Sequence, residues 1–400
     1  MLIGRMMKKL FILENRIQHY SWGSLTSIPE LLGIRNKVGR PFAELWMGAH
    51  PRAPSMALTD SLEVPLNVLI ARDPGFFLGD RVRRSFGDRL PFLFKVLAAE
   101  QPLSLQAHPD IDRAREGYAG EEKRGIPLDS PDRNYRDPNH KPEMICALTG
   151  FDALCGFRNL GEILELLAPI ESAALLTEGL ESGNPYKQLL SRMLFLPETE
   201  KKQVLSEVLA RAEHSESPPD RWAAHLAEFF SNDIGILAPY IFNLVHLQPG
   251  QALALKAGML HSYLHGTGIE LMANSDNVLR GGLTEKHVDR DELLRVLDFV
   301  PLEPNIIDPD PGRGDIAEYP SGAKEFVLSS LRLEGRGEVR IPGTPGPEII
   351  LCTEGRLVIR SEDETLMIVK GRSVFVAAET GAYTIKGVGR AFKASVPGDD

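Results

Sequence analysis

The spacing of hydrophobic residues changes markedly along the chain. From residue 42 to 148, short apolar runs such as AELWMGA (43–49) and PFLFKVLAA (91–99) are separated by polar loops, which is typical of β-strands. Between residues 157 and 234, apolar residues recur at every third or fourth position, which predicts amphipathic helices packed on a core. The pattern therefore predicts β-structure interrupted by a helical segment.

Strand-like runs return at 240–285 and are followed by a predicted helix over 290–299. The proline-rich stretch 301–311 is typical of a linker. Beyond it, turn-punctuated runs such as EIILCTEG and RLVIR favour a β-sandwich or barrel. The expected domains are a discontinuous first domain of residues 1–156 and 235–300, a helical domain of residues 157–234, and a C-terminal β-barrel domain of residues 312–400.

One segment inside the first domain, residues 109–139, is long and strongly polar. No apolar periodicity marks it as a helix or a strand, so we expect a loop. A long loop in a compact domain is usually functional, and we expect this one to form a lid or a rim over a site.

Composition and charge argue against several classes of protein. The 45 Lys+Arg against 55 Asp+Glu give a net charge of -10, which argues against a nucleic-acid or membrane-surface partner, since both require a basic field. No apolar run approaches the ~18 residues of a membrane span, and the run near the N-terminus is too short for a signal peptide. With three cysteines and no CxxC pair, a reducing cytoplasm is the expected location.

The first candidate site segment is QPLSLQAHPD, residues 101–110. Its alternation predicts a strand with Leu103 and Leu105 on one face and Ser104, Gln106 and His108 on the other. Such a row of polar groups suits ligand binding, but a solvent-exposed sheet edge would produce the same pattern.

Two further segments carry groups that could act in chemistry. NHKPEM (139–144) sets Lys141 and Glu143 two residues apart, which fits either a site or a solvated surface. In the segment 249–282, His261, Tyr263 and His265 alternate on one face. All ten histidines lie at or before position 287, so a His-ligated metal is expected upstream of the C-terminal β-domain.

Lys95 interrupts the otherwise apolar strand PFLFKVLAA. A buried ammonium needs either an acidic partner or an anionic ligand. A salt bridge to Glu44 or Glu100 and a contact with bound substrate are therefore both open interpretations.

Several long strings resemble type I phosphomannose isomerase, a family of the cupin superfamily, across almost all of residues 15–290. The separation of Gly250, Gly258 and His261 is similar to the second cupin motif, with Lys256 at a position where that motif has proline. The matching strings are IQHYSWGS (17–24), AELWMGAHPRAPS (43–55), LPFLFKVLAAEQPLSLQAHPD (90–110), NYRDPNHKPEM (134–144) and GIELMANSDNVLRGGLT (268–284).

The resemblance implies a mainly β fold with an α-helical insertion, consisting of a cupin-type jelly-roll catalytic domain and a second, C-terminal cupin-like β-barrel without metal ligands. It implies an aldose–ketose isomerase that interconverts mannose 6-phosphate and fructose 6-phosphate through an enediol-type intermediate. The expected partner is a small sugar phosphate, handled in carbohydrate metabolism or GDP-mannose supply, and a monomer is expected.

By the same resemblance, one divalent metal ion, Zn²⁺ by preference, is implied. Two imidazoles, a carboxylate and an amide oxygen form a plausible zinc set. The implied metal ligands are Gln106, His108, Glu143 and His261, with His265 as a competing imidazole. The implied catalytic residues are Arg280, Glu270, Lys141, Tyr263 and His140. The implied substrate-binding residues are Lys286, Ser104, Lys95 and Trp22.

Individual roles within this set stay open. Arg280 suits charge stabilisation because a guanidinium remains cationic at any working pH. Glu270 is the first candidate for the general base, Lys141 is its rival, and a structural role beside Arg280 is the alternative for Glu270. Trp22 and Trp46 fit either a sugar pocket or a core.

Two other functions compete with the isomerase. A cupin oxygenase would use a similar His/His/carboxylate set, whereas a non-catalytic sugar-phosphate-binding cupin would need no catalytic groups. The predicted Lys/Arg cluster favours a phosphorylated substrate, and Glu270 with Lys141 favours catalysis.

Overall fold

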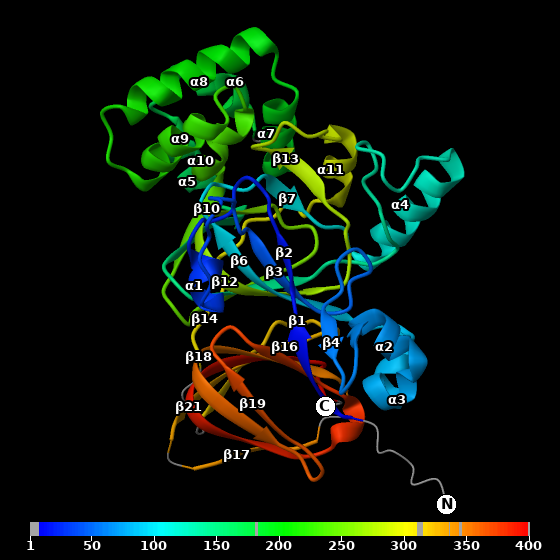
Figure 1. Ribbon diagram of the computed structural model, residues 1–400. Coiled ribbons are helices and arrows are strands. Elements are labelled where there is room, and N and C mark those ends of the chain that lie inside the picture. The colour runs from blue at the N-terminus through cyan, green and yellow to red at the C-terminus, as the bar shows by residue number, and fades with distance from the viewer. Residues whose placement is uncertain (1–7, 181–182, 310–314, 336, 344–345, 399–400) are drawn as a thin grey trace, which may run out of the picture.

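The computed structural model describes residues 8–180, 183–309, 315–335, 337–343 and 346–398. Two β-structured layers lie one above the other, and a group of helices covers the far end of the first layer (Figure 1). The described part of the chain is mainly β with a helical portion, as the hydrophobic pattern predicts.

The first sheet has 11 strands within the described residues and contains the candidate site. Its longest strand, β12 (His261–Ala273), pairs with β6 and β8 over its second half and with β7 and β9 over its first half. Because it contributes to both halves, β12 sets the register of the others. The other strands are β2 (Arg16–Gln18), β3 (Glu44–Met47), β6 (Phe92–Ala99), β7 (Leu105–Ala107), β8 (Glu143–Ala147), β9 (Phe151–Phe157), β10 (Phe242–Leu247), β11 (Ala252–Leu255), β13 (Leu279–Gly282) and β14 (Ile306–Ile307).

The second sheet combines C-terminal strands with three strands from the N-terminal region. Its C-terminal strands are β15 (Ile316–Tyr319), β16 (Val327–Glu334), β17 (Val339–Ile341), β18 (Glu348–Arg360), β19 (Thr365–Val369), β20 (Ser373–Val376) and β21 (Tyr383–Ser395). Its N-terminal strands are β1 (Leu10–Glu14), β4 (Met56–Leu58) and β5 (Glu63–Pro65). The predicted first domain of residues 1–156 therefore contains strands that pair with the second sheet. The domain division itself stays a prediction.

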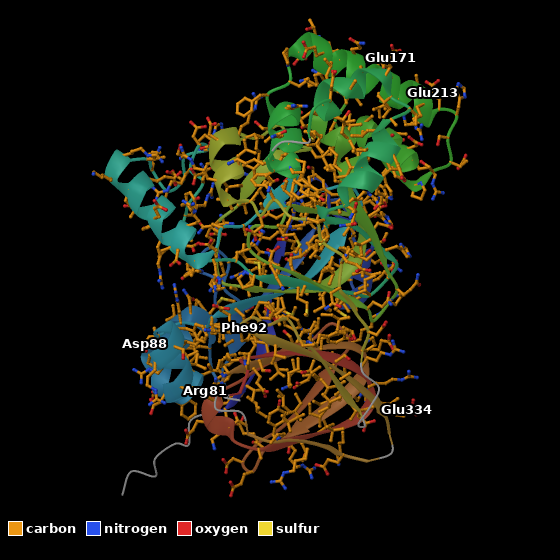
Figure 2. All side chains as sticks on the ribbon, turned by 180° about the vertical axis from the view of Figure 1, so that it is seen from behind. Arg81, Asp88, Phe92, Glu171, Glu213 and Glu334 are labelled. Atoms are coloured by element: carbon orange, nitrogen blue, oxygen red, sulfur yellow. The ribbon has the colours of Figure 1, made fainter. Side chains whose placement is uncertain are left out.

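A shared core holds the two sheets together. Phe11 of β1, Phe77 and Phe375 of β20 pack in one aromatic cluster, with ring centroids 5.9 to 6.4 Å apart. Helices α1 (Ser27–Leu32), α2 (Leu66–Arg72) and α3 (Pro74–Phe86) supply further side chains to this core. Figure 2 shows Phe92 between the sheets, far from Glu171 and Glu213 at the helical end.

The helical end is built from the segment in which the apolar residues show helical spacing. Its elements are α5 (Leu160–Leu167), α6 (Ala174–Thr177), α7 (Pro185–Leu194), α8 (Glu198–Ala212), α9 (Pro218–Phe229) and α10 (Ala238–Ile241). Asn159, Asn184 and Ser217 accept hydrogen bonds at the starts of α5, α7 and α9, which satisfies backbone N–H groups that the helix leaves free. Among the described residues, no helix combines the length and the apolar character needed to cross a bilayer.

The predicted loop over 109–139 was wrong in its first half. Residues Ile111–Arg124 form α4, which starts at the Asp110 side chain and ends at Gly125, with a φ of 69°. Few of its side chains are buried, so the sequence shows no apolar stripe. Instead, the buried Glu121 carboxylate accepts from the backbone N–H groups of Asn134 and Tyr135 (3.1 and 2.8 Å) and pairs with Arg133 (3.0 Å). The helix predicted over 290–299 is present as α11 (Arg290–Val296).

One buried carboxylate organises the helical end. Asp220, at the start of α9, accepts hydrogen bonds from Arg211 Nε (2.9 Å), Ser217 Oγ (2.5 Å) and Tyr240 Oη (2.6 Å), and from Ser215. Burial alone would favour the neutral acid, but these donors lower the pKa of Asp220 well below its usual value. The ionised side chain thereby ties the ends of α8 and α9 to α10.

Asp220→Asn should lower the free energy of unfolding by about 2 kcal/mol near neutral pH, because the amide loses charge-assisted hydrogen bonds to buried donors. Folding lowers the pKa of Asp220 below its unfolded value of about 3.9. The resulting stabilisation is fully present at a pH above that value and is lost as the pH falls through the folded pKa. Urea denaturation at pH 7 and at pH 3 measures both effects. Glu213→Gln, at an exposed position nearby, is the control. A difference between wild type and variant that stays constant down to pH 3 would contradict the assignment.

Candidate active site

Three buried side chains come together inside the first sheet. Glu143 begins β8, His261 begins β12, and His108 follows β7 directly. Glu143 Oε2 lies 3.2 Å from His108 Nε2 and 3.3 Å from His261 Nε2. The three offered atoms lie within 4.8 Å of one another, and His108 Nε2 makes no hydrogen bond within the described structure. Converging lone pairs of this kind are what a divalent metal requires.

Backbone carbonyls keep both imidazoles in the tautomer that can bind a metal through Nε2. His108 Nδ1 lies 2.7 Å from the carbonyl of Asn277, and His261 Nδ1 lies 3.1 Å from that of Met259. A carbonyl can only accept, so each Nδ1 carries the proton and each Nε2 is left with a free lone pair. Burial, with the Lys141 charge nearby, lowers the pKa of His108 to about 4, so the ring is neutral at pH 7.

The carboxylate of the set is kept ionised by its surroundings. Burial favours the neutral acid, but the Lys141 ammonium holds the pKa of Glu143 well below its usual value. Lys141 Nζ lies 2.8 Å from Glu143 Oε1, which leaves Oε2 facing the two imidazoles. Two imidazoles that turn Nε2 toward one point and an ionised carboxylate fit a catalytic zinc site.

Gln106 lies beside this set in the sheet. In β7 it pairs with His261 of β12 on one side and with Arg280 of β13 on the other. The predicted strand over 101–110 is only Leu105–Ala107. Ser104 and Gln106 both line a common cavity, but Leu103, which the alternation predicts on the opposite face, lines it too, and His108 is not among its lining residues.

That cavity has a volume of about 700 Å³. The metal-ligand set adjoins it, since Lys141 lines the cavity and contacts Glu143. Tyr20, Trp22 and Trp46 supply aromatic walls, and the Tyr20 and Trp22 rings stack with centroids 5.6 Å apart. Trp22 and Trp46 therefore both face the cavity, while Trp46 is also almost fully buried. The basic side chains that line it are Arg52, Lys95, Arg133, Arg136, Lys141, Arg280 and Lys286.

Three of these cations form a cluster on the cavity wall. Burial lowers the pKa of Arg280, and the Arg136 charge adds to the effect. Partial burial lowers the pKa of Lys286, with contributions from Arg280 and Arg136. Arg136, Arg280 and Lys286 make no ion pair within the part of the chain that the structure describes. Like charges held together without acidic partners are suited to binding an anion such as a phosphate.

A second charged group, which the sequence analysis assigned no role, lies on another wall. Asp276 Oδ2 is 3.4 Å from His50 Nε2, and its Oδ1 is 3.6 Å from Arg52 Nη2. Burial opposes ionisation, but His50 and Arg52 lower the pKa of Asp276 to about 2. Asp276, Arg52 and Arg136 lie within the strings that resemble the family. Nothing else in the sequence pointed to them, because their positions follow no periodic pattern.

Lys95 is neutralised by two carboxylates beside the cavity. Its Nζ lies 2.7 Å from Glu270 Oε2 and 3.6 Å from Glu44 Oε1, while Trp46 donates to Glu44 Oε2 at 2.7 Å. All of these side chains are buried. Burial opposes the charge, but Glu270 and Glu44 raise the pKa of Lys95; burial also raises the pKa of Glu270. Lys95 therefore forms the predicted salt bridge with Glu44 and a second one, which was not predicted, with Glu270.

Three other candidates lie away from the cavity walls. His140 Nε2 contacts Glu325 Oε1 at 2.7 Å, in the segment between β15 and β16. The Tyr263 hydroxyl is buried without a hydrogen-bond partner among the described residues, and burial raises the pKa of Tyr263 well above its usual value. A register shift between Tyr263 and His265 breaks the alternation, so His265 is exposed and does not join His261.

Curated relatives match the chain over most of its length. It is 38% identical to the mannose-6-phosphate isomerase of Salmonella typhimurium, covering 94% of this chain and 97% of the relative. It is 32% identical to mannose-6-phosphate isomerase 1 of Arabidopsis thaliana, covering 93% and 90%. The chain belongs to the type I phosphomannose isomerase family.

Family models and solved structures agree with this membership. The model of the phosphomannose isomerase type I catalytic domain matches residues 10–160, and that of the mannose-6-phosphate isomerase cupin domain matches residues 315–396. A structure of the Salmonella typhimurium isomerase bound to fructose 6-phosphate and zinc superimposes with a TM-score of 0.90 at 37% identity, covering 97% of this chain and 100% of that one. A holo, zinc-bound isomerase structure matches equally well. The predicted cupin fold class is thus confirmed.

The first family match includes the strands that hold Gln106, His108 and Glu143, whereas His261 lies beyond it. In the type I phosphomannose isomerase fold of this chain, two sequence segments over 100 residues apart thus complete one candidate metal centre. The second match covers the sheet without histidines, where aliphatic side chains form a core.

Proposed function

We propose that the chain is a zinc-dependent aldose–ketose isomerase that interconverts mannose 6-phosphate and fructose 6-phosphate. The observation that carries this proposal is the juxtaposition, at one cavity, of the buried His108–Glu143–His261 set and the Arg136–Arg280–Lys286 cluster. A metal site beside an anion site suits a sugar whose reacting carbons and phosphate lie at opposite ends.

His108, Glu143 and His261 would hold the ion, with Gln106 as the fourth protein ligand. When bound, the zinc ion supplies Lewis-acid stabilisation of negative charge on the sugar oxygens. The residues present fit this task because the His108 imidazole is neutral and the Glu143 carboxylate is ionised. No thiolate is needed, and a mixed nitrogen and oxygen set is typical of catalytic sites.

Isomerisation moves a proton between C2 and C1 by way of an enediol-type species. The group that moves it must reach the sugar, and Lys141 lines the cavity beside Glu143. Glu270 is not among the described residues that line the cavity, and its carboxylate is held by Lys95. We therefore favour Lys141 over Glu270 as the proton-transferring residue, with Glu270 held by Lys95 behind the cavity wall.

At the other end, Lys286, Arg280 and Arg136 would bind the phosphate, with Ser104 as a neutral donor. The stacked Tyr20 and Trp22 rings offer an aromatic face to the sugar. An oxygenase has no comparable use for a cluster of unpaired cations, so this cluster favours the isomerase.

Removal of the metal should abolish activity. After dialysis against a chelator, a coupled assay of mannose 6-phosphate conversion should show no turnover above background, and zinc should restore it, because the ion supplies the main electrophile. His108→Ala, which lacks one ligand, should not recover with zinc. Full turnover in a sample shown by elemental analysis to be free of metal would contradict the proposal.

Lys286→Ala should raise KM about 10- to 100-fold, because one charge-assisted contact to the phosphate is lost, and should leave kcat nearly unchanged. Steady-state kinetics with mannose 6-phosphate measure both constants. Lys202→Ala, which removes an exposed lysine of α8, is the matched control and should leave KM unchanged. An unchanged KM for the Lys286 variant would remove this residue from the phosphate site.

Lys141→Met should lower kcat about 100- to 10,000-fold, whereas Glu270→Gln should lower it far less, because only Lys141 lines the cavity. Zinc content is measured for each variant, so that loss of metal is separated from loss of proton transfer. The opposite ranking, with Glu270→Gln more damaging in zinc-loaded protein, would restore Glu270 as the base.

A further inference from the structure

A fully buried asparagine lies between the metal ligand His108 and the wall of the cavity. Asn277 has none of its surface exposed, and it follows β12 in the segment that leads to β13. Its backbone carbonyl is the partner of His108 Nδ1, at 2.7 Å. The position of this carbonyl therefore determines how the imidazole of His108 is oriented.

The side chain of Asn277 uses its full hydrogen-bonding capacity on one loop. Oδ1 accepts from the backbone N–H groups of Arg136 (2.7 Å) and Asp137 (3.2 Å). Nδ2 donates to the carbonyls of Asp137 (2.7 Å) and Asn139 (2.8 Å). Because two donors face the oxygen and two acceptors face the nitrogen, the amide has one possible orientation.

The loop of residues 136–139 also accepts hydrogen bonds from the segment that contains Asn277. The Asp137 carboxylate accepts from the Ser275 hydroxyl at 2.9 Å and from the backbone N–H of Asp276 at 2.7 Å. Hydrogen bonds from both segments thus hold residues 136–139 against residues 275–277. The loop of residues 136–139 carries Arg136 of the cation cluster and leads, two residues after Asn139, to Lys141.

We propose that Asn277 is a positioning residue that places the metal ligand His108 and the substrate wall carrying Arg136 and Lys141 in a single fixed arrangement. Its carbonyl orients the ligand and its amide orients the loop, so neither can shift without the other. The proposal extends the isomerase function above, on which its account of metal and substrate rests, and assigns Asn277 no contact with the reacting atoms.

Asn277→Asp is the sharpest test, because it keeps the size of the side chain but points a carboxylate oxygen at two carbonyls. The loop and the His108 partner should both move. We expect zinc affinity, measured by competition with a chromophoric chelator, to fall about 10- to 100-fold. We expect kcat/KM for mannose 6-phosphate to fall about 100-fold in zinc-saturated protein, since small displacements of catalytic groups have effects of this size.

Asn243→Asp is the matched control. Asn243 also ties backbone segments together through its amide, with Nδ2 3.1 Å from the carbonyl of Phe157 and 2.8 Å from that of Leu302, but these hydrogen bonds reach neither a candidate metal ligand nor the 136–139 loop. This variant should lower Tm while zinc affinity and kcat/KM stay at wild-type values. Asn277→Ser, which removes the amide without adding charge, should show the same losses as Asn277→Asp to a smaller degree, and it decides the matter if Asn277→Asp does not fold.

Two results would overturn the proposal. One is a folded Asn277 variant with wild-type zinc affinity and wild-type kcat/KM. The other is an equal loss of zinc affinity in Asn243→Asp, which would trace the effect to general destabilisation. A wild-type chain that binds zinc but does not isomerise the sugar would defeat the proposed function alone, because the comparison of zinc affinities would still decide the role of Asn277.

Discussion

The site depends on keeping the Glu143 carboxylate ionised in a place from which water is excluded. Desolvation of a lone carboxylate would favour its protonated form, which could not hold a metal. The Lys141 ammonium, 2.8 Å from Glu143 Oε1, offsets this cost. The lysine contacts the candidate ligand Glu143 and also lines the cavity, so the candidate metal site and the cavity share one boundary.

A second buried charge group lies next to the first and is balanced differently. Lys95 lies between Glu270 and Glu44, so a cation is matched by two anions inside the sheet. Arg136, Arg280 and Lys286 have no such partners among the described residues. The net charge of -10 therefore hides a local contrast: Lys95 and Lys141 beside the candidate metal ligands are paired with carboxylates, whereas the Arg136–Arg280–Lys286 cluster remains available for an anion.

The failures of the sequence analysis have physical causes. Alternation alone placed His265 with His261, but a register shift after Tyr263 turns it to the surface. Helix α4 was missed because it is held by Glu121 and Arg133 rather than by an apolar stripe. Asn277 and Asp276 gave no signal of their own, since an asparagine in a turn and one that bridges two segments look the same in a sequence.

The sequence by itself indicated the fold class, a helical segment within the β-structure, the family, and His108, Glu143 and His261 as candidate metal ligands, because period and motif are local properties of the chain. The tertiary structure alone decided which charges are paired: that Lys95 meets Glu270, that His140 turns to Glu325, and that Arg136 joins Arg280. The physical reason is that pairing depends on distances between segments more than 100 residues apart, which only the fold brings together, as the register of β12 with β6 places Glu270 opposite Lys95.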